Sequence, residues 1–451
     1  MDERELIKRC ASAWEDQSLR LALADFLAAY RDGERAELIR LQLGPQPFSK
    51  QTQWKIKTLL KDNAQRWCGP MAPKQCTFVG GLLENLSLKS ARDLETLLRW
   101  RDAPPIRRVA LSCKRVPPRN LQALAESNVL AYVEELTLDY SAVDMPTGMA
   151  EELAALVAAP PLARLRSLVL QDAPMSADGA GAFAVVSMPP ELESVTVRAC
   201  GLDAAAVRAF VAGPWLSRVR RLDLTHNRID DAGAAALAGA STLSGLSWLD
   251  LSQNPLANEG FAALAAGGLS GLATLRARCH AVGTDGVRGF MAGKGLPTLV
   301  DLRIGEGAFR LDAGVGKAVA EGALAAQLRT FSLTGGRVGD DGCAALFSTP
   351  ALDGLVALVL ERVELADKAV MALAASRAVV GLERLSLDGH FGDKAVASLV
   401  TCDGLRALKK VKIIGTTVSP SAQKTLSDRF GALLVAADEP VLEDEKKAES
   451  E

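Results

Sequence analysis

Apolar residues return along this chain in a short pattern that repeats about every 27 residues. Its two clearest copies are VRRLDLTHNRIDDAGAAALAGA from Val219 and LSWLDLSQNPLANEGFAALAAG from Leu246. A period of about 20 to 50 residues is typical of a solenoid, and a solenoid usually serves as a binding surface. Regular copies open at Leu165, Leu192, Val219, Leu246, Leu272, Leu299, Leu328, Leu355, Leu382 and Leu408, and less regular copies open at Leu83, Ile106 and Val133.

Each copy predicts a strand followed by a helix. The first, fourth and sixth positions are apolar, as in Val219, Leu222 and Leu224, and this alternation indicates a strand with one buried face. The Ala- and Leu-rich segment that follows has apolar residues three and four apart, which indicates a helix packed behind the strand. The fifteenth position is small, as in Gly233, so that the helix can approach its neighbour closely.

A polar residue follows each of the two clearest strands. Asn227 and Asn254 occupy the ninth position of their copies, where the side chain can hydrogen-bond the backbone of the turn and tie successive turns together. Cys200 occupies the same position in its own copy, and this repeat pattern accepts that substitution.

From Leu165 to about Leu426 the segments resemble leucine-rich repeats, and their DAG and DDG helix openings resemble the ribonuclease-inhibitor subclass. The resemblance implies an α/β fold, a curved horseshoe with a parallel sheet on the concave face and helices on the convex face. Such a fold forms one continuous core, so the length of 451 residues does not require several globular domains.

The first part of the chain carries no repeat. Residues 18–43 predict two helices broken at Asp32 and Gly33, with apolar faces formed by Leu21, Ala24, Phe26, Leu27, Leu38, Ile39 and Leu41. The stretch resembles the repeat-companion domain of some bacterial proteins in Leu19, Arg20, Leu21, Ala24, Asp25, Phe26, Leu27, Arg35, Ala36, Glu37, Ile39, Arg40, Leu41 and Gln42. We therefore expect a small all-α domain at residues 1–78 that seals the edge of a solenoid at residues 79–436.

Residues 437–451 are predicted to form a disordered acidic tail. They contain seven acidic residues, from Asp438 to Glu451, against Lys446 and Lys447. A tail in solvent is the favoured interpretation, because exposed charge pairs contribute only about 0–1 kcal/mol. The alternative is a tail that folds back on Lys409, Lys410 and Lys412 of the last predicted strand.

Composition excludes several classes. The net charge is −2, so no overall field attracts nucleic acid or an anionic membrane. The charged start MDERELIKRC lacks the apolar segment of a secretory signal. Eight cysteines are scattered without a CxxC motif, which favours reduced thiols and a cytoplasmic location.

The open face of the predicted sheet carries the most telling side chains. Trp248 lies among arginines there and has the composition of an interface hot spot. Parallel strands about 4.8 Å apart place Asp223 beside Asp250. The alternative is that these charges only keep an exposed sheet soluble. The candidate partner-binding residues are Arg221, Asp223, His226, Trp248, Asp250, Arg276, Arg278, Asp301 and Arg303.

Catalysis is not expected. Nothing should desolvate Asp223 and Asp250 on an open sheet, so a strongly shifted pKa is not predicted for either carboxyl group. His226, His280 and His390 are each expected in the loop after a strand, and we predict no metal site. No nucleotide-binding or protease motif occurs, so we predict no cofactor.

We therefore predict a non-enzymatic scaffold that binds another protein through the concave face. Acidic residues between the arginines argue against nucleic acid, and we expect neither a membrane nor a small molecule as partner. The resemblance alone implies an alternative, since some leucine-rich-repeat proteins of this subclass activate small GTPases.

Overall fold

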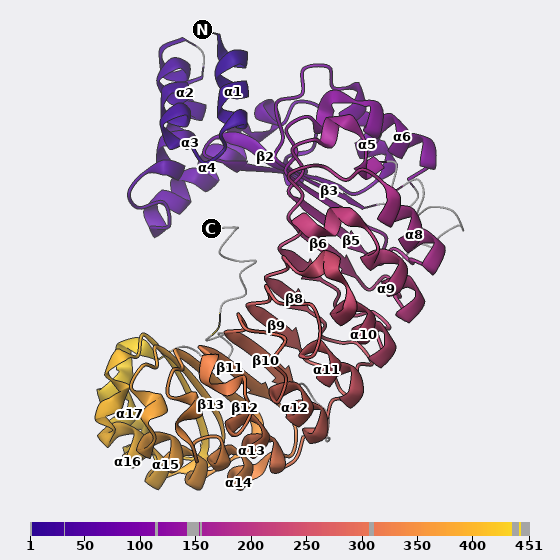
Figure 1. Ribbon diagram of the computed structural model, residues 1–451. Helices are drawn as coiled ribbons and strands as arrows, with labels where there is room; N and C mark the ends of the chain where they lie inside the picture. Colours follow the sequence, from indigo (N-terminus) through magenta and orange to yellow (C-terminus); the bar gives the residue numbers. More distant parts are fainter. Residues whose placement is uncertain are drawn as a thin grey trace. The chain divides into compact units, whose positions relative to one another are not determined.

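The computed structural model describes residues 2–30, 32–112, 116–141, 156–305 and 311–434, together with residues 153 and 442. The chain divides into two compact units, Met1–Cys200 and Gly201–Glu451 (Figure 1). This division falls within the repeats, so the boundaries predicted at residues 78 and 436 stay a prediction, and most of the predicted tail lies outside the described residues.

Four helices open the first unit: α1 (Glu3–Ser12), α2 (Gln17–Tyr30), α3 (Gly33–Leu43) and α4 (Lys50–Trp67). The predicted break is confirmed, and Asp32 caps α3 by accepting a hydrogen bond from the Arg35 backbone N–H. The apolar faces of α1, α2 and α3 enclose a core that includes Trp14, Leu23 and Ile39. Leu21 was predicted in that core, but its side chain is 43% exposed because it lies on the outer face of α2.

The rest of the first unit is a sheet with helices behind it. Its strands are β1 (Cys76–Val79), β2 (Leu82–Leu88), β3 (Arg108–Ser112), β4 (Glu135–Asp139), β5 (Ser167–Gln171) and β6 (Ser194–Arg198). Strands β2 to β6 pair in parallel in sequence order, whereas β1 is antiparallel to β2. The described helices of this part are α5 (Ala91–Arg99), α6 (Pro118–Glu126) and α8 (Ala177–Val185).

In the second unit the repeats are more regular. Its parallel strands are β7 (Arg221–Asp223), β8 (Trp248–Asp250), β9 (Thr274–Ala277), β10 (Asp301–Gly305), β11 (Thr330–Thr334), β12 (Ala357–Leu365), β13 (Arg384–Gly392) and β14 (Lys410–Thr417). Its helices are α9 (Ala204–Val211), α10 (Asp231–Gly239), α11 (Asn258–Leu264), α12 (Thr284–Met291), α13 (Gly314–Ala320), α14 (Gly339–Ala345), α15 (Asp367–Ala375), α16 (Asp393–Thr401) and α17 (Pro420–Phe430). Short 3-10 turns, such as Pro214–Arg218, precede many of the strands.

All thirteen predicted strands are present, and the α/β leucine-rich-repeat fold is confirmed. In both units the helices form a layer behind the sheet (Figure 1). The apolar side chains of the strands are buried in the core. Leu222, Leu224 and Leu237 of one copy are fully buried there. Since burying a Leu side chain contributes about 1.5–3 kcal/mol, repeated layers of this kind hold the coils together.

Neighbouring helices approach closely where the repeat has glycine. A Cβ atom at Gly260 would lie 2.5 Å from the Asp231 Cα of the preceding helix, and no real Cβ comes so near another carbon. The small fifteenth position is therefore required by helix packing, as predicted. The ring of Phe261, the residue after Gly260, stacks on the ring of Phe290 in the next helix with their centroids 4.5 Å apart.

The polar ladder between the turns is also confirmed. Asn254 Oδ1 accepts the Ile229 N–H at 3.0 Å, and its Nδ2 donates to the Leu224 and Leu251 carbonyls, both at 2.9 Å. Asn227 makes two equivalent contacts one copy earlier, accepting the Leu202 N–H and donating to the Leu224 carbonyl. In the next copy the thiol of Cys279 donates to the Leu251 carbonyl at 3.2 Å. Cys279, one position before the expected one, thus takes over the role of asparagine, which the sequence pattern did not reveal.

Strand β1 pairs with β2 and covers the outer edge of the parallel strands. The N-terminal helices hydrogen-bond the β1–β2 hairpin and hold it in place. Gln42 donates from Nε2 to the Phe78 carbonyl at 2.8 Å and accepts the Gly81 N–H at 2.7 Å. Arg35 Nε donates to the Gly81 carbonyl at 3.0 Å. The N-terminal helices were expected to seal the edge themselves, whereas β1 pairs with it and the helices fix β1 in place.

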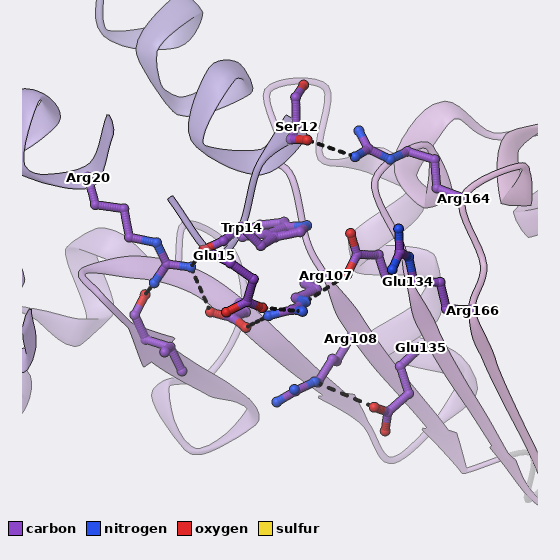
Figure 2. Close-up of polar contacts among 12 residues, drawn as sticks. Ser12, Trp14, Glu15, Arg20, Arg107, Arg108, Glu134, Glu135, Arg164 and Arg166 are labelled. Atoms are coloured by element: carbon purple, nitrogen blue, oxygen red, sulfur yellow. Dashed lines mark hydrogen bonds and ion pairs between the residues drawn. The ribbon is translucent and has the colours of Figure 1, made fainter. Parts of the chain in front are cut away.

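Buried ion pairs link these helices to the first repeats (Figure 2). Glu84, 2% exposed, contacts Arg20 Nη2 at 3.4 Å and Arg107 Nη1 at 3.1 Å. Arg107 also pairs with Glu134 at 2.8 Å and with Glu15 at 2.6 Å. Burial by itself lowers the pKa of Arg107, but the hydrogen bond and the charge of Glu134 outweigh it, so the pKa lies above its ordinary value. We call these residues the junction cluster.

Candidate protein-binding face

Strands β7 to β10 carry seven of the nine candidate residues, and His226 and Arg278 lie in the segments that follow β7 and β9. Arg221 pairs with Trp248 in register, and Asp223 with Asp250. Asp250 pairs in turn with Arg276, which pairs with Arg303. The predicted columns of side chains are therefore confirmed. Six residues define what we call the sheet-face patch: Arg221, Asp223, Trp248, Asp250, Arg276 and Arg278.

Trp248 is the centre of the patch. The guanidinium carbon of Arg221 lies 3.6 Å from the centre of the indole ring, and that of Arg276 lies 5.2 Å from it. Both distances are within the range of a cation–π attraction, which strengthens when the groups are desolvated. The Trp248 side chain is only 4% exposed, so the expectation of an outward, solvent-facing tryptophan is wrong. The strand period points the ring to the open face, but its neighbours cover it.

The two aspartates accept hydrogen bonds from the backbone of the turns that follow them. Asp223 accepts the Thr225 N–H at 3.0 Å, and Asp250 accepts the Ser252 N–H at 2.9 Å. Their side chains are 4% and 6% exposed. Burial raises the pKa of Asp250, and the charge of Asp223 adds to it, while the hydrogen bonds from Ser252 and the charge of Arg276 oppose it. The expectation that nothing desolvates these carboxylates is therefore wrong.

Around the patch the remaining candidates have different surroundings. Arg303 Nη2 pairs with Asp301 Oδ2 at 2.9 Å, so these two charges of β10 neutralise each other. His226 is exposed at the end of its turn, where its backbone has a positive φ of 59°. Arg278 is half-buried, and Arg221 is also half-buried. The structure thus brings five of the nine predicted residues together on adjacent strands, places Arg278 directly after β9, and leaves three at the border.

The patch contains hydrogen-bond donors whose acceptors do not come from the described residues. The Trp248 Nε1 and the Arg278 Nε are buried, and neither has a hydrogen-bond partner in the described part of the chain. A buried donor without an acceptor costs about 1–3 kcal/mol. A ligand that brings carboxylate or carbonyl oxygens would remove that cost, so the patch suits an acceptor-rich ligand.

The lysines at the other end of this sheet face are already engaged. Lys409 Nζ pairs with Glu383 at 2.8 Å, and Lys412 Nζ pairs with Glu361 at 3.2 Å. Lys412 is partly buried, with 12% of its side chain exposed. Two of the three lysines that the sequence offered to the acidic tail therefore have carboxylate partners within the sheet.

The other candidate metal-binding and reactive side chains do not come together in the described part of the chain. Among the described residues no three His, Cys, Asp or Glu side chains come together as metal ligands. His280 Nε2 lies 3.2 Å from Gln253 Oε1, and His390 lies within β13, not in a loop as predicted. The seven cysteines of the described part are all free thiols. Throughout that part of the chain, every helix is too short or too polar to cross a membrane.

Comparison with known proteins supports the class. The sequence profile described as "Leucine Rich repeat" matches residues 219–238, the copy that contains β7 and α10. No curated protein matches the chain. Among solved structures, the chain is similar to one from "Crystal structure of Rad7 and Elc1 complex in yeast", with 16% identity, 73% of this chain and 88% of that chain covered, and a TM-score of 0.36. A likeness of that size carries no argument about function.

The strand–turn–helix coils and the asparagine ladder, together with the profile matched at residues 219–238, define a leucine-rich-repeat fold. Proteins of this repeat class are typically interaction scaffolds that hold other proteins.

Proposed function

We propose that this chain is a non-enzymatic scaffold that binds a partner protein through the sheet-face patch and its border. The buried donors of Trp248 and Arg278, which lack acceptors among the described residues, are the observation that carries the proposal. Native proteins seldom leave such donors unsatisfied, and each exception needs an explanation, such as a water, an ion or a partner atom that completes the hydrogen bond.

The stacked arginines fit that role. Arg221 and Arg276 hold the indole of Trp248 in one position, so the surface is ordered before a partner arrives. Preorganisation lowers the entropy lost on binding, and Trp and Arg are enriched among residues that dominate interface energies. Because the ring itself is covered, Arg221, Arg278 and the adjacent turns would make first contact with the partner.

Partner capture by variants with matched charge changes tests the proposal. Arg278→Gln removes one positive charge from the patch, and Arg208→Gln removes one from the exposed side of α9, behind the sheet. The full-length protein and both variants would be compared by affinity capture with quantitative mass spectrometry. We expect partners that are retained by Arg208→Gln and lost at least about tenfold in Arg278→Gln, a range usual for interface hot spots. Equal capture by both variants would remove the patch from the proposal.

The finer assignments belong to the same proposal. We propose the ribonuclease-inhibitor-like subclass, a bacterial repeat-companion domain at residues 1–78 and a cytoplasmic location. The DAG-type helix openings and the residues shared by α2 and α3 support the first two. We propose that the solenoid occupies residues 79–436 and that the acidic tail occupies residues 437–451.

Regulation of a small GTPase rests on resemblance alone, and it has a separate test. Stimulated phosphate release from a candidate GTPase, lost in Arg221→Ala, would favour it over passive binding. Asn227→Ala is unsuitable for this purpose because Asn227 is buried and holds the turns together through Leu202 and Leu224.

A further inference from the structure

We propose, resting on the function proposed above, that the sheet-face patch binds acidic peptide segments and that the chain's own residues 438–451 are such a segment, which competes with the partner. The segment carries seven carboxylates against Lys446 and Lys447. Its chemistry is therefore that of the ligand which the buried donors require.

The donors of the patch favour carboxylates over neutral acceptors. Trp248 Nε1 and Arg278 Nε are buried donors with no acceptor in the described part of the chain. A hydrogen bond from a guanidinium to a carboxylate is roughly twice as strong as one between neutral groups. An acidic side chain that reaches the patch can satisfy Arg278 and offset its charge in one contact.

The aspartates of the patch do not take that place. Asp223 and Asp250 each accept an N–H of their own turn, from Thr225 and Ser252 respectively. Asp301 pairs with Arg303. These carboxylates are thus engaged in other contacts and do not supply the acceptors of Trp248 Nε1 and Arg278 Nε.

The acidic segment is long enough to reach the sheet-face patch from its attachment at β14. Leu434 bridges to Val411 at β14, and residues 435–451 follow it. Strands about 4.8 Å apart place β8 about 29 Å from β14 along the sheet. An extended chain covers about 3.3 Å per residue, so the remaining residues can span about 55 Å. The acidic residues begin four positions after Leu434, which leaves most of them within range of the patch.

Two of the nearer lysines already have partners. Lys409 pairs with Glu383 in an exposed position, and Lys412 pairs with Glu361 in a partly buried one. Displacing the partner of Lys412 gains nothing, whereas filling an unsatisfied site removes an existing cost. Arg384 Nε of β13 is one buried donor without an acceptor in the described part of the chain, whereas the patch offers two, Trp248 Nε1 and Arg278 Nε. The patch is therefore the better target for this segment.

Because the acidic segment is tethered to the same chain as the patch, weak binding is sufficient to keep the patch occupied. A short flexible connection gives an effective concentration of about 1 mM, so a segment with a Kd of about 100 µM would occupy its own patch about nine-tenths of the time. A partner would then bind about tenfold more weakly to the intact chain than to a chain with an uncharged tail.

The test uses the full-length chain with all seven acidic tail residues changed to Asn or Gln, which we call the neutral-tail variant. A fluorescein-labelled peptide with the sequence of residues 437–451 is titrated by anisotropy into this variant and into the wild type. We expect a Kd of about 100 µM for the neutral-tail variant and binding at least about tenfold weaker to the wild type. Arg278→Gln in the neutral-tail background should abolish binding, and Arg208→Gln should leave it unchanged. Equal binding to wild type and neutral-tail variant, or equal loss in both arginine variants, would overturn the proposal.

Two further readouts separate the alternatives. A mass that rises with concentration in light scattering of the wild type, but not of the neutral-tail variant, would show exchange of tails between copies and overturn occupation within one chain. Partner capture with both tails distinguishes this inference from the proposed function. Peptide binding at Arg278 without any captured partner overturns the function alone, whereas Arg278-dependent capture that is equal for both tails overturns this inference alone.

Discussion

Two clusters of arginines in this protein have different surroundings. In the junction cluster of the first unit, Arg20 and Arg107 share the buried carboxylate of Glu84, and Arg107 has two more carboxylate partners in Glu134 and Glu15. In the sheet-face patch of the second unit, Arg221 and Arg276 stack on Trp248, and the nearby aspartates accept N–H groups of their own turns.

The difference indicates a structural role for the junction cluster and a binding role for the sheet-face patch. Buried charges that are paired within the chain contribute to stability, since removing one partner strands the other. Arg20 Nε and Arg278 Nε are both buried without an acceptor among the described residues, but of these two arginines only Arg20 pairs with a buried carboxylate, that of Glu84. Both clusters combine arginines with acidic residues, so the partner of each guanidinium decides which role its cluster has.

The largest effect is expected at the junction cluster. Glu84→Ala leaves Arg20 and Arg107 without their shared buried carboxylate and should lower the stability of the first unit by about 3–5 kcal/mol. Hydrogen exchange of β2 and β3 under increasing urea would measure this locally. If Glu84→Ala lowers the stability by less than about 1 kcal/mol, the ion pairs of the junction cluster are no stronger than exposed ones. The junction cluster would then not differ from the patch in its contribution to stability.

A smaller loss is expected on removing the indole of the patch. Trp248→Ala deletes a buried ring and its two cation–π contacts, and should cost about 2–4 kcal/mol in the stability of the second unit. Hydrogen exchange of β7 to β9 is the measurement. Trp248→Phe keeps a ring for Arg221 to cover and is the matched control, which should recover more than half of the loss. Equal losses would show that the indole does not act through stacking.

A still smaller change, of opposite sign, is expected at Asp250. Its raised pKa means that the folded chain binds this proton more readily than the unfolded chain, so the ionised carboxylate costs stability at neutral pH and the cost fades as the pH falls through the raised pKa. Asp250→Asn keeps an oxygen for the Ser252 N–H and removes the charge. The thermal midpoint of the variant should exceed that of the wild type at about pH 7, and the gap should narrow towards about pH 4. A gap that widens on acidification would reverse the assigned cause.

The smallest effect on stability is expected for Arg278→Gln. Arg278 is half-buried, and its Nε has no acceptor among the described residues, so its loss should not lower the stability of the second unit by more than about 0.5 kcal/mol. The same variant should lose binding of the acidic peptide. A large loss of stability would instead place Arg278 with the junction arginines, as a structural residue. Thermal unfolding and peptide anisotropy on one preparation would compare the two readouts directly.

The sequence by itself determined the coils of this protein. Alternating apolar residues such as Leu222 and Leu224 predicted every repeat strand, and in all but the first copy the strand begins two residues after the predicted opening. Glycine at the fifteenth position predicted the close helix approach at Gly260, and Asn254 predicted the ladder between turns. These features follow from local periodicity, because each coil repeats the same backbone and buries the same positions.

Only the tertiary structure decided what surrounds each polar side chain. Trp248 is covered by arginines from strands one copy before and one copy after it, and buried Glu84 is paired with Arg20 from a helix 64 positions earlier. Cys279 replaces an asparagine because its thiol meets the Leu251 carbonyl of the preceding coil. The burial and pairing of a polar group depend on neighbours that are distant along the chain, and a local pattern carries no record of them.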